Sequence, residues 1–212
     1  MSTSRTAIVL AGGRSSRFGL NKGLQTLAGK ALIRHVAERL SGAVDEVLVV
    51  VGRDESKAKY EAVLLSLARV INDDQEGKNP LVGVVSGLRA VESDLVAVLA
   101  CDTPFISRAV IDLLFQRASD ADAAIPRWNA GRIEPLQAVY RRLPTLRAAQ
   151  EALANRDSSQ KEMINRLARV VYISVEDKIR SIDPSLRTFF NINAREDMLA
   201  AERMAGEKNS SQ

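Results

Sequence analysis

Short apolar runs rich in β-branched residues alternate with stretches of helical periodicity along the first half of the chain. Four runs are predicted to be buried strands: Ala7 to Ala11, Val47 to Val51, Val70 to Ile71 and Leu95 to Ala100. Apolar residues between them recur at helical spacing, as in Leu32, Val36 and Leu40. This alternation predicts an α/β fold with three Rossmann-like layers, in which helices cover both faces of a mostly parallel sheet. Ligands of such sheets bind beyond the carboxyl ends of the strands, so residues directly after strands are the first functional candidates.

The second half of the chain is less regular and adds strands of its own. Strands are predicted at Ala123 to Ile125, Leu136 to Tyr140 and Val170 to Ser174, and helices at Pro144 to Ala154, Gln160 to Leu167 and Ala194 to Met204. We expect these strands to join the same sheet, which becomes mixed, and to add a flap over its edge. Because the sequence has no low-complexity linker, it predicts a single domain over residues 1–205, followed by a tail, 206–212, without fixed structure.

Composition excludes several classes of protein. Of the 212 residues, 46% are hydrophobic and 26% are charged, which is typical of a folded globular chain. The longest apolar run, Leu95 to Cys101, is far shorter than the ~20 residues of a membrane span, and the sequence shows no export signal, so we expect no membrane partner. Cys101 is the single cysteine, which excludes an internal disulfide and a thiolate metal cluster and predicts a cytoplasmic protein.

Positive charge is concentrated near the start of the sequence. The first 37 residues contain six basic residues and no acidic one, whereas the remaining 175 contain 24 basic and 26 acidic residues. A nucleic-acid-binding protein more often spreads its Lys and Arg residues along a face or a helix, and the aromatic content of 4% argues against base stacking. Charge gathered around one loop favours a compact polyanion such as a triphosphate, so we expect no nucleic-acid partner.

A glycine-rich loop with basic and hydroxyl side chains follows the first predicted strand. It spans residues 10–24 and reads LAGGRSSRFGLNKGL. Glycine allows close backbone approach, so successive N–H groups can turn toward one anion, while Arg17 and Lys22 supply charge. The spacing matches neither the Walker loop nor the GxGxxG fingerprint. The loop is interpreted as a phosphate cradle, and the alternative is an ordinary strand-to-helix turn that needs its glycines.

A second candidate lies directly after the strand that ends at Ala100. Asp102 stands at the carboxyl edge of the predicted sheet, where the glycine-rich loop also begins. A triphosphate brings Mg²⁺, which prefers one or two carboxylates together with phosphate oxygens and water, so Asp102 is a candidate metal ligand. The alternative is that Asp102 caps a helix beginning near Pro104. Cys101 has no histidine near it in the sequence and is interpreted as a small buried residue, and the single histidine, His35, as a helix-surface group.

These two motifs carry a resemblance to a known family. The segment LAGGRSSRFGLNKGL with the following LAGKALIRHV, and the segment CDTP at 101–104, resemble the molybdenum cofactor guanylyltransferases of the nucleotidyltransferase superfamily. The chain departs from the family pattern at Phe18, where methionine is usual, and at Asn21, where an acidic residue is usual. The resemblance covers nearly the whole chain and implies a nucleotide-binding half over 1–104 and an acceptor-binding half over 105–205.

The resemblance also assigns residues to the nucleotide. It implies that Gly13, Arg17 and Lys22 contact the phosphates, that Leu10, Ala11 and Gly12 supply backbone atoms beside the base and sugar, and that Asp102 is the metal ligand. Asp73, after the third predicted strand, corresponds to the family's acidic position for ribose or guanine, and the alternative is a solvated loop. Many relatives place an asparagine after the second strand, where this chain has Gly52 and Arg53.

Two later segments resemble the part of the family that handles the second substrate. Residues 132–142 resemble the family's segment beneath that substrate, and residues 189–197 resemble the family's C-terminal motif with two asparagines. Asn191 and Asn193 are therefore expected to assist acceptor or metal binding, and the alternative is that they cap the final helix. Four basic residues are candidates for the acceptor phosphate, although a solvated surface is the usual place for each: Arg127, Arg132, Arg141 and Lys161.

The activity implied by the resemblance is transfer of GMP from GTP to the terminal phosphate of molybdenum-loaded molybdopterin, with release of pyrophosphate. The expected partners are GTP, molybdopterin and the proteins upstream and downstream in cofactor synthesis, and the expected metal is Mg²⁺ or Mn²⁺. A CTP-dependent relative, or a transferase for another phosphorylated acceptor, would use the same loop and the same aspartate. The alternatives from other classes are a nucleotide-binding module that handles the cofactor without catalysis and a basic nucleic-acid-binding protein.

Overall fold

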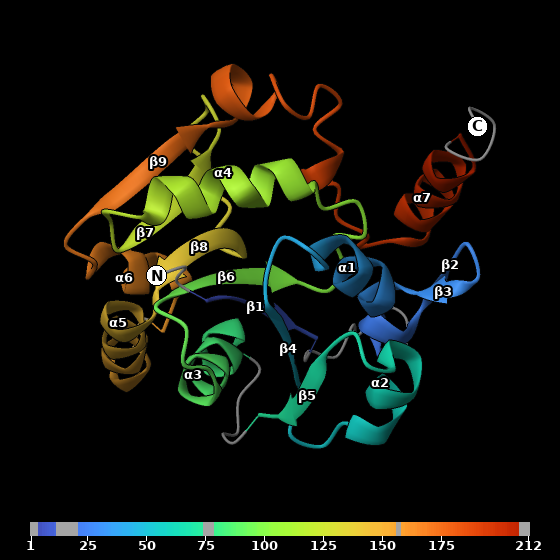
Figure 1. The fold of residues 1–212 in the computed structure, drawn as a ribbon, viewed down its shortest axis with the longest axis horizontal. Coiled ribbons are helices and arrows are strands. Elements are labelled where there is room, and N and C mark those ends of the chain that lie inside the picture. The colour runs from blue at the N-terminus through green and yellow to red at the C-terminus, as the bar shows by residue number, and fades with distance from the viewer. Residues whose placement is uncertain (1–3, 12–20, 74–78, 156–157, 208–212) are drawn as a thin grey trace.

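The fold is described from a computed structural model over residues 4–11, 21–73, 79–155 and 158–207 (Figure 1). The strands are β1 (Arg5–Leu10), β2 (Thr26–Leu27), β3 (Lys30–Ala31), β4 (Glu46–Val51), β5 (Arg69–Asn72), β6 (Leu95–Ala100), β7 (Ala123–Arg127), β8 (Gln137–Arg141) and β9 (Val170–Ser174). The helices are α1 (Leu32–Leu40), α2 (Lys57–Leu64), α3 (Pro80–Ala90), α4 (Arg108–Ala118), α5 (Arg142–Ala154), α6 (Gln160–Asn165) and α7 (Arg195–Glu207). Short helical turns are η1 (Lys22–Leu24), η2 (Val175–Ile179) and η3 (Arg187–Phe189).

One seven-stranded sheet organises the molecule, in the order β5-β4-β1-β6-β8-β7-β9. Strands β5, β4, β1 and β6 are parallel, and Leu10 at the end of β1 is level with Val50 and Ala100. Strand β8 is antiparallel to both of its neighbours, whereas β9 is again parallel to β7. The predicted α/β fold with a mostly parallel, mixed sheet is confirmed.

Helices cover both faces of the sheet, because alternate residues of each strand point to opposite sides. Val9 belongs to the core beneath α1, α2 and α4, and Ile8 belongs to the core shared with α3, α5 and α6. Figure 1 shows α4 above the sheet and α3 and α5 below it. Helix α3 approaches β1 so closely that a Cβ at Gly87 would lie 2.7 Å from Cγ2 of Ile8. Glycine at this position therefore allows the layers to meet.

A third, smaller core joins the β2–β3 hairpin to α7, beside α1 (Figure 1). The hairpin turns through Ala28 and Gly29, whose φ angles are 47° and 78°. Its buried Leu27 packs with Ile192 and with Ala201 of α7. The periodicity of the sequence did not predict this hairpin, since each of its strands has only two residues. The C-terminal segment is thereby brought against the segment that follows the glycine-rich loop.

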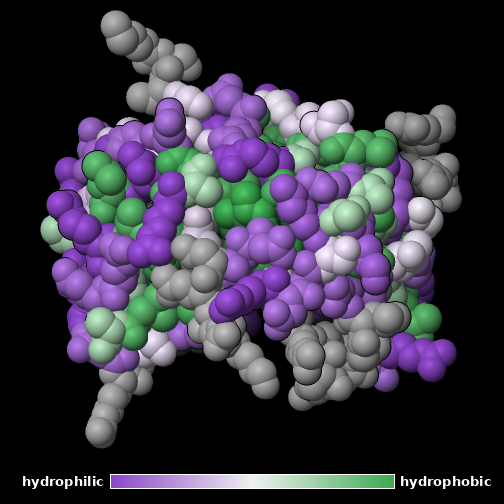
Figure 2. Space-filling model, turned by 90° about the horizontal axis from the view of Figure 1, so that it is seen from below, coloured by the Kyte–Doolittle hydropathy of each residue, from purple (hydrophilic) through white to green (hydrophobic). Residues whose placement is uncertain are grey.

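The surface carries its large hydrophobic side chains in separate places. Figure 2 shows a largely hydrophilic face interrupted by small apolar groups. The exposed large hydrophobic residues come from different parts of the chain: Leu65, Leu143, Tyr172, Ile182 and Leu199. Scattered apolar residues of this kind are normal on soluble proteins. Among the described helices, none has the length and apolar character needed to cross a membrane.

Candidate active site

Three side chains from distant parts of the sequence meet at the carboxyl edge of the parallel strands. The Lys22 ammonium donates to Oδ2 of Asp102 over 2.6 Å and to Oδ1 of Asn193 over 2.8 Å. Asp102 lies 80 positions after Lys22 in the sequence, and Asn193 lies 171 positions after it. The prediction that the end of the glycine-rich loop and the mid-chain aspartate lie together is confirmed. We call these residues the Lys22 cluster.

Lys22 is positioned by a turn that packs against the core. It begins the 3₁₀ turn η1, and the next residue, Gly23, is buried. A Cβ at Gly23 would lie 3.2 Å from Cε1 of Tyr60 and 3.6 Å from Sγ of Cys101. A larger residue would push the turn away from the sheet, so the glycine keeps the Lys22 ammonium within reach of Asp102.

Asp102 is positioned by hydrogen bonds on both sides of it. The Cys101 N–H donates to the carbonyl of Leu10 over 3.1 Å, which continues the pairing of β6 with β1. The Thr103 hydroxyl donates to the carbonyl of Ala100 over 2.9 Å. The carbonyl of Asp102 itself accepts from the N–H of Ile192 over 2.9 Å. The strand end and the C-terminal segment together hold this aspartate.

The predicted start of the helix that follows β6 is wrong. Helix α4 begins at Arg108 after Ser107, four residues later than the predicted start near Pro104. Residues 101–107 form turns instead, since Phe105 and Ile106 bury their side chains before the helix starts. The alternative interpretation of Asp102 as a helix cap is therefore wrong, because Asp102 is too far from the first turn of α4.

The Asp102 carboxylate has one oxygen paired and one oxygen without a partner. Its Oδ2 accepts from Lys22, whereas Oδ1 is buried and makes no hydrogen bond to any described residue. Leaving a buried carboxylate oxygen unpaired costs free energy, so such an atom points to a missing ligand. The described residues contain no group of three or more acidic, histidine or cysteine side chains able to hold a metal. The site fits a cation such as Mg²⁺ that takes one carboxylate and obtains its other oxygens from substrate and water.

Asn191 and Asn193 lie on the same side of the C-terminal segment. Ile192 between them is fully buried, so its two neighbours turn outward. The Asn193 side chain accepts from Lys22, and Asn191 lines the cavity described below. The start of α7 is capped by Asp197, whose carboxylate accepts from the N–H groups of Asn193 and Ala194 over 2.8 Å. The alternative that the two asparagine side chains cap the last helix is therefore wrong for Asn193.

Asp73 lies at the same edge of the sheet, just beyond β5. Its N–H donates to the carbonyl of Val51 over 2.8 Å, and its Oδ1 accepts from the Ser86 hydroxyl over 2.6 Å. A Cβ at Gly83 would lie 3.7 Å from its Oδ2, so α3 packs directly beside this carboxylate. The alternative of a freely solvated loop residue does not describe this position. Its predicted contact with ribose or guanine stays a prediction.

Leu10 and Ala11 lie at the carboxyl edge of the sheet, where β1 ends. Their main-chain groups already form hydrogen bonds within the protein. The Leu10 carbonyl accepts from Cys101, and the Ala11 N–H donates to the carbonyl of Val50 over 2.8 Å. The Ala11 carbonyl lies 3.3 Å from the Tyr60 hydroxyl, whose proton is directed mainly to Glu55 at 2.6 Å. A nucleotide contact here would use the second lone pair of a carbonyl oxygen. Gly12, Gly13 and Arg17, also predicted to bind nucleotide, lie outside the described residues.

The loop after β4 is held by hydrogen bonds from residues that no sequence motif indicates. The side-chain amide of Asn72 donates to the carbonyls of Gly52 and Glu55 over 3.1 and 2.9 Å. The Tyr60 hydroxyl donates to the Glu55 carboxylate over 2.6 Å, and burial raises the pKa of Tyr60. These contacts shape the loop at Gly52 and Arg53, where the family resemblance leads us to expect an asparagine. Only tertiary contacts reveal them, since Asn72 and Tyr60 belong to no recognised motif.

A cavity of about 250 Å³ opens beside the Lys22 cluster. It is bordered by Asp102 and Thr103, by Asn191 and Asn193, by residues 134–137 and by Gln160. Because β8 runs opposite to β6, residues at its beginning, not at its end, lie level with the end of β6, as the pairing of Gln137 with Leu99 shows. The predicted acceptor segment is thus next to the predicted metal ligand.

The candidate acceptor arginines lie elsewhere. Arg141 forms an ion pair with Asp94 at the opposite end of β8 and donates to the carbonyl of Ser119 over 2.7 Å. Arg127 lies over the ring of Tyr172, and Arg132 lies over the ring of Trp128. Arg132 also contacts Glu134, which borders the cavity, over 3.0 Å, but its own side chain is 65% exposed, and none of the three arginines borders the cavity itself. The expectation is wrong for Arg141, and for the other two the solvated-surface alternative describes their stacked positions.

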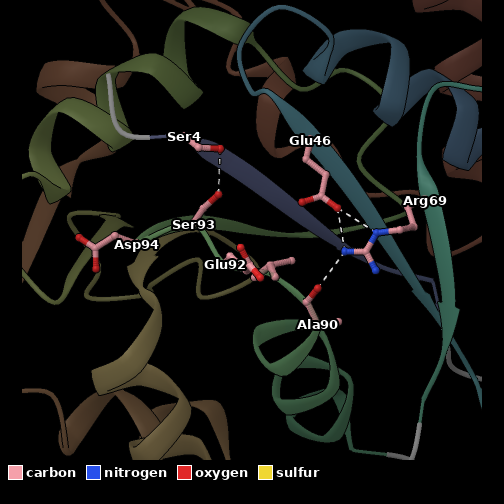
Figure 3. A pocket seen from close by; sticks show the side chains of 8 residues that line it. Ser4, Glu46, Arg69, Ala90, Glu92, Ser93 and Asp94 are labelled. Carbon is pink, nitrogen blue, oxygen red and sulfur yellow. Dashed lines mark hydrogen bonds and ion pairs between the residues drawn. The ribbon is translucent and has the colours of Figure 1, made fainter. Parts of the chain in front are cut away.

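A second cavity, of about 520 Å³, lies at the opposite edge of the sheet (Figure 3). Its one cationic side chain among the described lining residues, Arg69, donates to Glu46 over 2.7 Å and to the carbonyl of Ala90 over 2.8 Å. Ser93 bonds to the hydroxyls of Ser4 and Thr6. Most polar groups here are paired within the protein, as the dashed lines in Figure 3 show. The cavity beside Asp102 is therefore the better candidate for the site.

Cys101 and His35 take no part in the site. Cys101 is buried, and this burial, with a further contribution from the charge of Asp102, raises the pKa of its thiol to about 12. A thiol with such a pKa is neutral at physiological pH and is a poor nucleophile. A ring nitrogen of His35 hydrogen-bonds the carbonyl of Leu27 over 2.7 Å, which ties α1 to the β2–β3 hairpin.

Comparison with known proteins agrees with this geometry. Residues 7–170 match the MobA-like NTP transferase domain. A probable molybdenum cofactor guanylyltransferase of Methanosarcina acetivorans is 40% identical over 92% of this chain and 88% of its own length. One from Natronomonas pharaonis is 35% identical over 95% of this chain and 98% of its own length.

Solved structures give the same result. The crystal structure of molybdopterin-guanine dinucleotide biosynthesis protein A from Archaeoglobus fulgidus has a TM-score of 0.80 and 31% identity, covering 95% of this chain and 99% of that protein. A 4-diphosphocytidyl-2C-methyl-D-erythritol synthase from Anaerococcus prevotii shares the fold alone, with a TM-score of 0.71, 15% identity and 96% of both chains covered. The resemblance found in the sequence is confirmed, and the chain belongs to the MobA-like NTP transferase family.

Proposed function

We propose that this protein transfers GMP from GTP to the terminal phosphate of molybdopterin and releases pyrophosphate. The observation that carries the proposal is the Lys22 cluster, in which an ammonium and a carboxylate meet at 2.6 Å where ligands of parallel sheets bind. The names of relatives support guanine over cytosine, since the Methanosarcina and Natronomonas proteins are named probable molybdenum cofactor guanylyltransferases.

In the proposed reaction, a terminal phosphate oxygen of molybdopterin attacks the α-phosphorus of GTP. A new phosphoanhydride bond forms as the bond from the α-phosphorus to the bridging oxygen breaks, and pyrophosphate carries away the electron pair. This transfer needs no covalent enzyme intermediate, because positioning and charge stabilisation supply most of the catalysis. The neutral, buried Cys101 is consistent with a direct transfer.

The charged residues of the site have complementary parts in this proposal. Oδ1 of Asp102, which lacks a partner among the described residues, would hold Mg²⁺, and Mn²⁺ has the same oxygen preference. Bound Mg²⁺ would neutralise charge on the phosphate oxygens. Lys22 compensates the Asp102 charge without substrate and would donate to the phosphates when they are present.

The remaining predicted residues complete the nucleotide site in the proposal. Arg17 and Gly13 would bind phosphates, and Asp73 would accept from ribose hydroxyls or guanine N–H groups. Leu10, Ala11 and Gly12 would border the base and sugar. Asn193 would hold Lys22 in position, and Asn191 would face the acceptor. We further propose a cytoplasmic location, which the single reduced cysteine supports, and exchange of substrate and product with other proteins of cofactor synthesis.

The test is a pyrophosphate-release assay with purified protein, molybdopterin and Mg²⁺. GTP, CTP and ATP are offered separately and then in competition, and the product is identified by mass spectrometry. We expect release with GTP and a product in which GMP is joined to the pterin. Preferential consumption of CTP would contradict guanine selectivity, and tight GTP binding without product would support a non-catalytic nucleotide-binding module.

A further inference from the structure

The cavity beside Asp102 contains a second polar atom without a partner. Nε2 of Gln160 is buried and makes no hydrogen bond within the described part of the chain, although Gln160 lines the cavity. A buried N–H donor without an acceptor costs free energy, and native proteins leave few of them. The unpaired Nε2 group therefore indicates a ligand that brings an acceptor atom into the cavity.

Contacts on both sides hold Gln160 in place. The hydroxyl of Ser159 caps α6 by accepting from the N–H of Glu162 over 3.1 Å, which fixes the first helical residue, Gln160. The carbonyl of Ser158 accepts from the side-chain amide of Asn79. Asn79 also caps α3 through the N–H of Leu81 over 2.9 Å. The loop that carries Gln160 is thus attached to the helix beside the predicted nucleotide site.

The lining of the cavity does not suit an isolated phosphate group. Its charged side chains, among the described residues, are the carboxylates of Asp102 and Glu134, and no lysine or arginine is among them. The polar remainder is mostly carboxamides, including Gln160 and Asn191. Each carboxylate has a cation beside it, since Lys22 pairs with Asp102 and Arg132 contacts Glu134 at 3.0 Å. Arg132 is 65% exposed and screened by solvent whereas Lys22 is 16% exposed, so a doubly negative phosphate would be attracted mainly to the Asp102 end.

Glu134 supplies a hydrogen-bond acceptor, which complements the N–H donor of Gln160. Its Oε1 accepts from the indole of Trp128 over 2.7 Å and contacts the Arg132 guanidinium at 3.0 Å. Both of these contacts are made by Oε1, and the side chain is only 19% exposed. The cavity thus presents one unpaired N–H donor and one carboxylate acceptor. This pair suits a neutral ring that carries both kinds of hydrogen-bonding group.

The size of the cavity agrees with a ring and not with a complete acceptor. Its volume of about 250 Å³ is below the roughly 300–1,000 Å³ of pockets for drug-sized ligands. It would accommodate one fused bicyclic ring, with the phosphate directed toward Lys22.

We infer that Gln160 contacts the acceptor substrate and that, together with Glu134, it binds the neutral pterin ring by hydrogen bonds while the acceptor phosphate points to the Lys22 cluster. The inference rests on the proposed function for the identity of the ring. It assigns a binding role to a residue outside the motifs that carry the family resemblance.

A titration with a phosphate-free pterin tests this inference directly. The binding of 6-hydroxymethylpterin is followed by its own fluorescence for the unmodified protein, Gln160→Ala and Gln160→Glu. Loss of one hydrogen bond is expected to raise the Kd about two- to tenfold in Gln160→Ala. Gln160→Glu replaces the N–H donor by a third carboxylate in the cavity. This carboxylate would repel a carbonyl oxygen of the ring, so we expect the Kd of Gln160→Glu to exceed that of Gln160→Ala. The matched control is Gln150→Ala, because Gln150 is exposed on α5, and its Kd should be unchanged.

Steady-state kinetics give a second measurement. In Gln160→Ala the KM for molybdopterin should rise by a similar factor while the KM for GTP stays constant. Unfolding curves of the variants establish that each is folded. An unchanged Kd in Gln160→Ala, no binding of the pterin to the unmodified protein at millimolar concentration, or a rise confined to the KM for GTP would overturn the inference. These outcomes differ from failure of the proposed function, which is absence of pyrophosphate release by the unmodified protein.

Discussion

The parallel half of the sheet and strand β8 of the mixed half reach the site by opposite strand ends. In the parallel half (β5, β4, β1 and β6), the site residues Asp73 and Asp102 follow their strands. In the mixed half (β8, β7 and β9), Glu134 comes before β8, because β8 is reversed and begins at the edge where β6 ends. The metal and nucleotide candidates therefore follow strands, whereas the acceptor candidate Glu134 precedes one and is not indicated by the rule that ligands bind after parallel strands.

The halves also differ in chemistry. Around the parallel half the polar groups are charged and meet at short distance, as in the 2.6 Å contact of Lys22 with Asp102. Around the mixed half they are mostly carboxamides, and the buried Gln137 donates to the hydroxyl and carbonyl of Thr188. Charge suits a triphosphate and its metal, whereas amides suit a neutral ring. The comparison predicts that substitutions in the parallel half reduce nucleotide binding and catalysis, and that substitutions in the mixed half reduce binding of the acceptor.

The largest effect is expected for Asp102→Asn. This change removes the carboxylate charge that would hold the metal, and we expect kcat/KM to fall by roughly three orders of magnitude. Pyrophosphate release measures it, and Asp120→Asn, an exposed aspartate after α4, is the control. A rate within a factor of a few of the unmodified protein would break the assignment of chemistry to the parallel half.

Lys22→Met is expected to lower kcat/KM by roughly a hundredfold, because the ammonium no longer offsets phosphate charge. Without nucleotide, the same variant should bind Mn²⁺ more tightly, since no cation competes for Asp102. Titration of Mn²⁺ followed by electron paramagnetic resonance measures this binding, and the exposed Lys57→Met is the control. Weaker Mn²⁺ binding in Lys22→Met would argue that Lys22 supports the metal site instead of occupying it.

Asn193→Ala tests how the C-terminal segment, which follows the mixed half, serves the parallel half. It removes one acceptor from the Lys22 ammonium, and we expect kcat/KM for GTP to fall roughly five- to tenfold. The double variant with Lys22→Met should be no worse than Lys22→Met alone, because both changes remove one interaction. Additive losses would mean that Asn193 acts independently of Lys22.

The smallest effect concerns stability in the parallel half. Gly87→Ala forces a methyl group against Ile8, and we expect the free energy of unfolding to fall by about 1–3 kcal/mol. Gly206→Ala is the matched control, because Gly206 lies on α7 with no atom within 4 Å of a Cβ. That change should be neutral or stabilise by less than ~1 kcal/mol. Urea unfolding measures both, and equal stability of the two variants would contradict the close approach of α3 to β1.

Much of the fold was predictable because it depends on local pattern. Each strand of the large sheet lies within two residues of its predicted bounds. The late start of α4 was missed, since a proline suits both a first helical turn and a non-helical turn. The β2–β3 hairpin was missed because its turn places Ala28 in a left-handed conformation that alanine rarely adopts.

The sequence by itself determined the layered α/β architecture, the family, and the identities of Lys22 and Asp102, because periodicity and short motifs are local properties. Only the tertiary structure decided that β8 is reversed, that Asn193 joins Lys22, and that Gln160 lines the cavity. Strand direction and register depend on pairing between distant segments, and a side chain finds its partner only after those segments are packed. The local pattern therefore identified the charged residues of the site, and long-range packing determined which residues contact them.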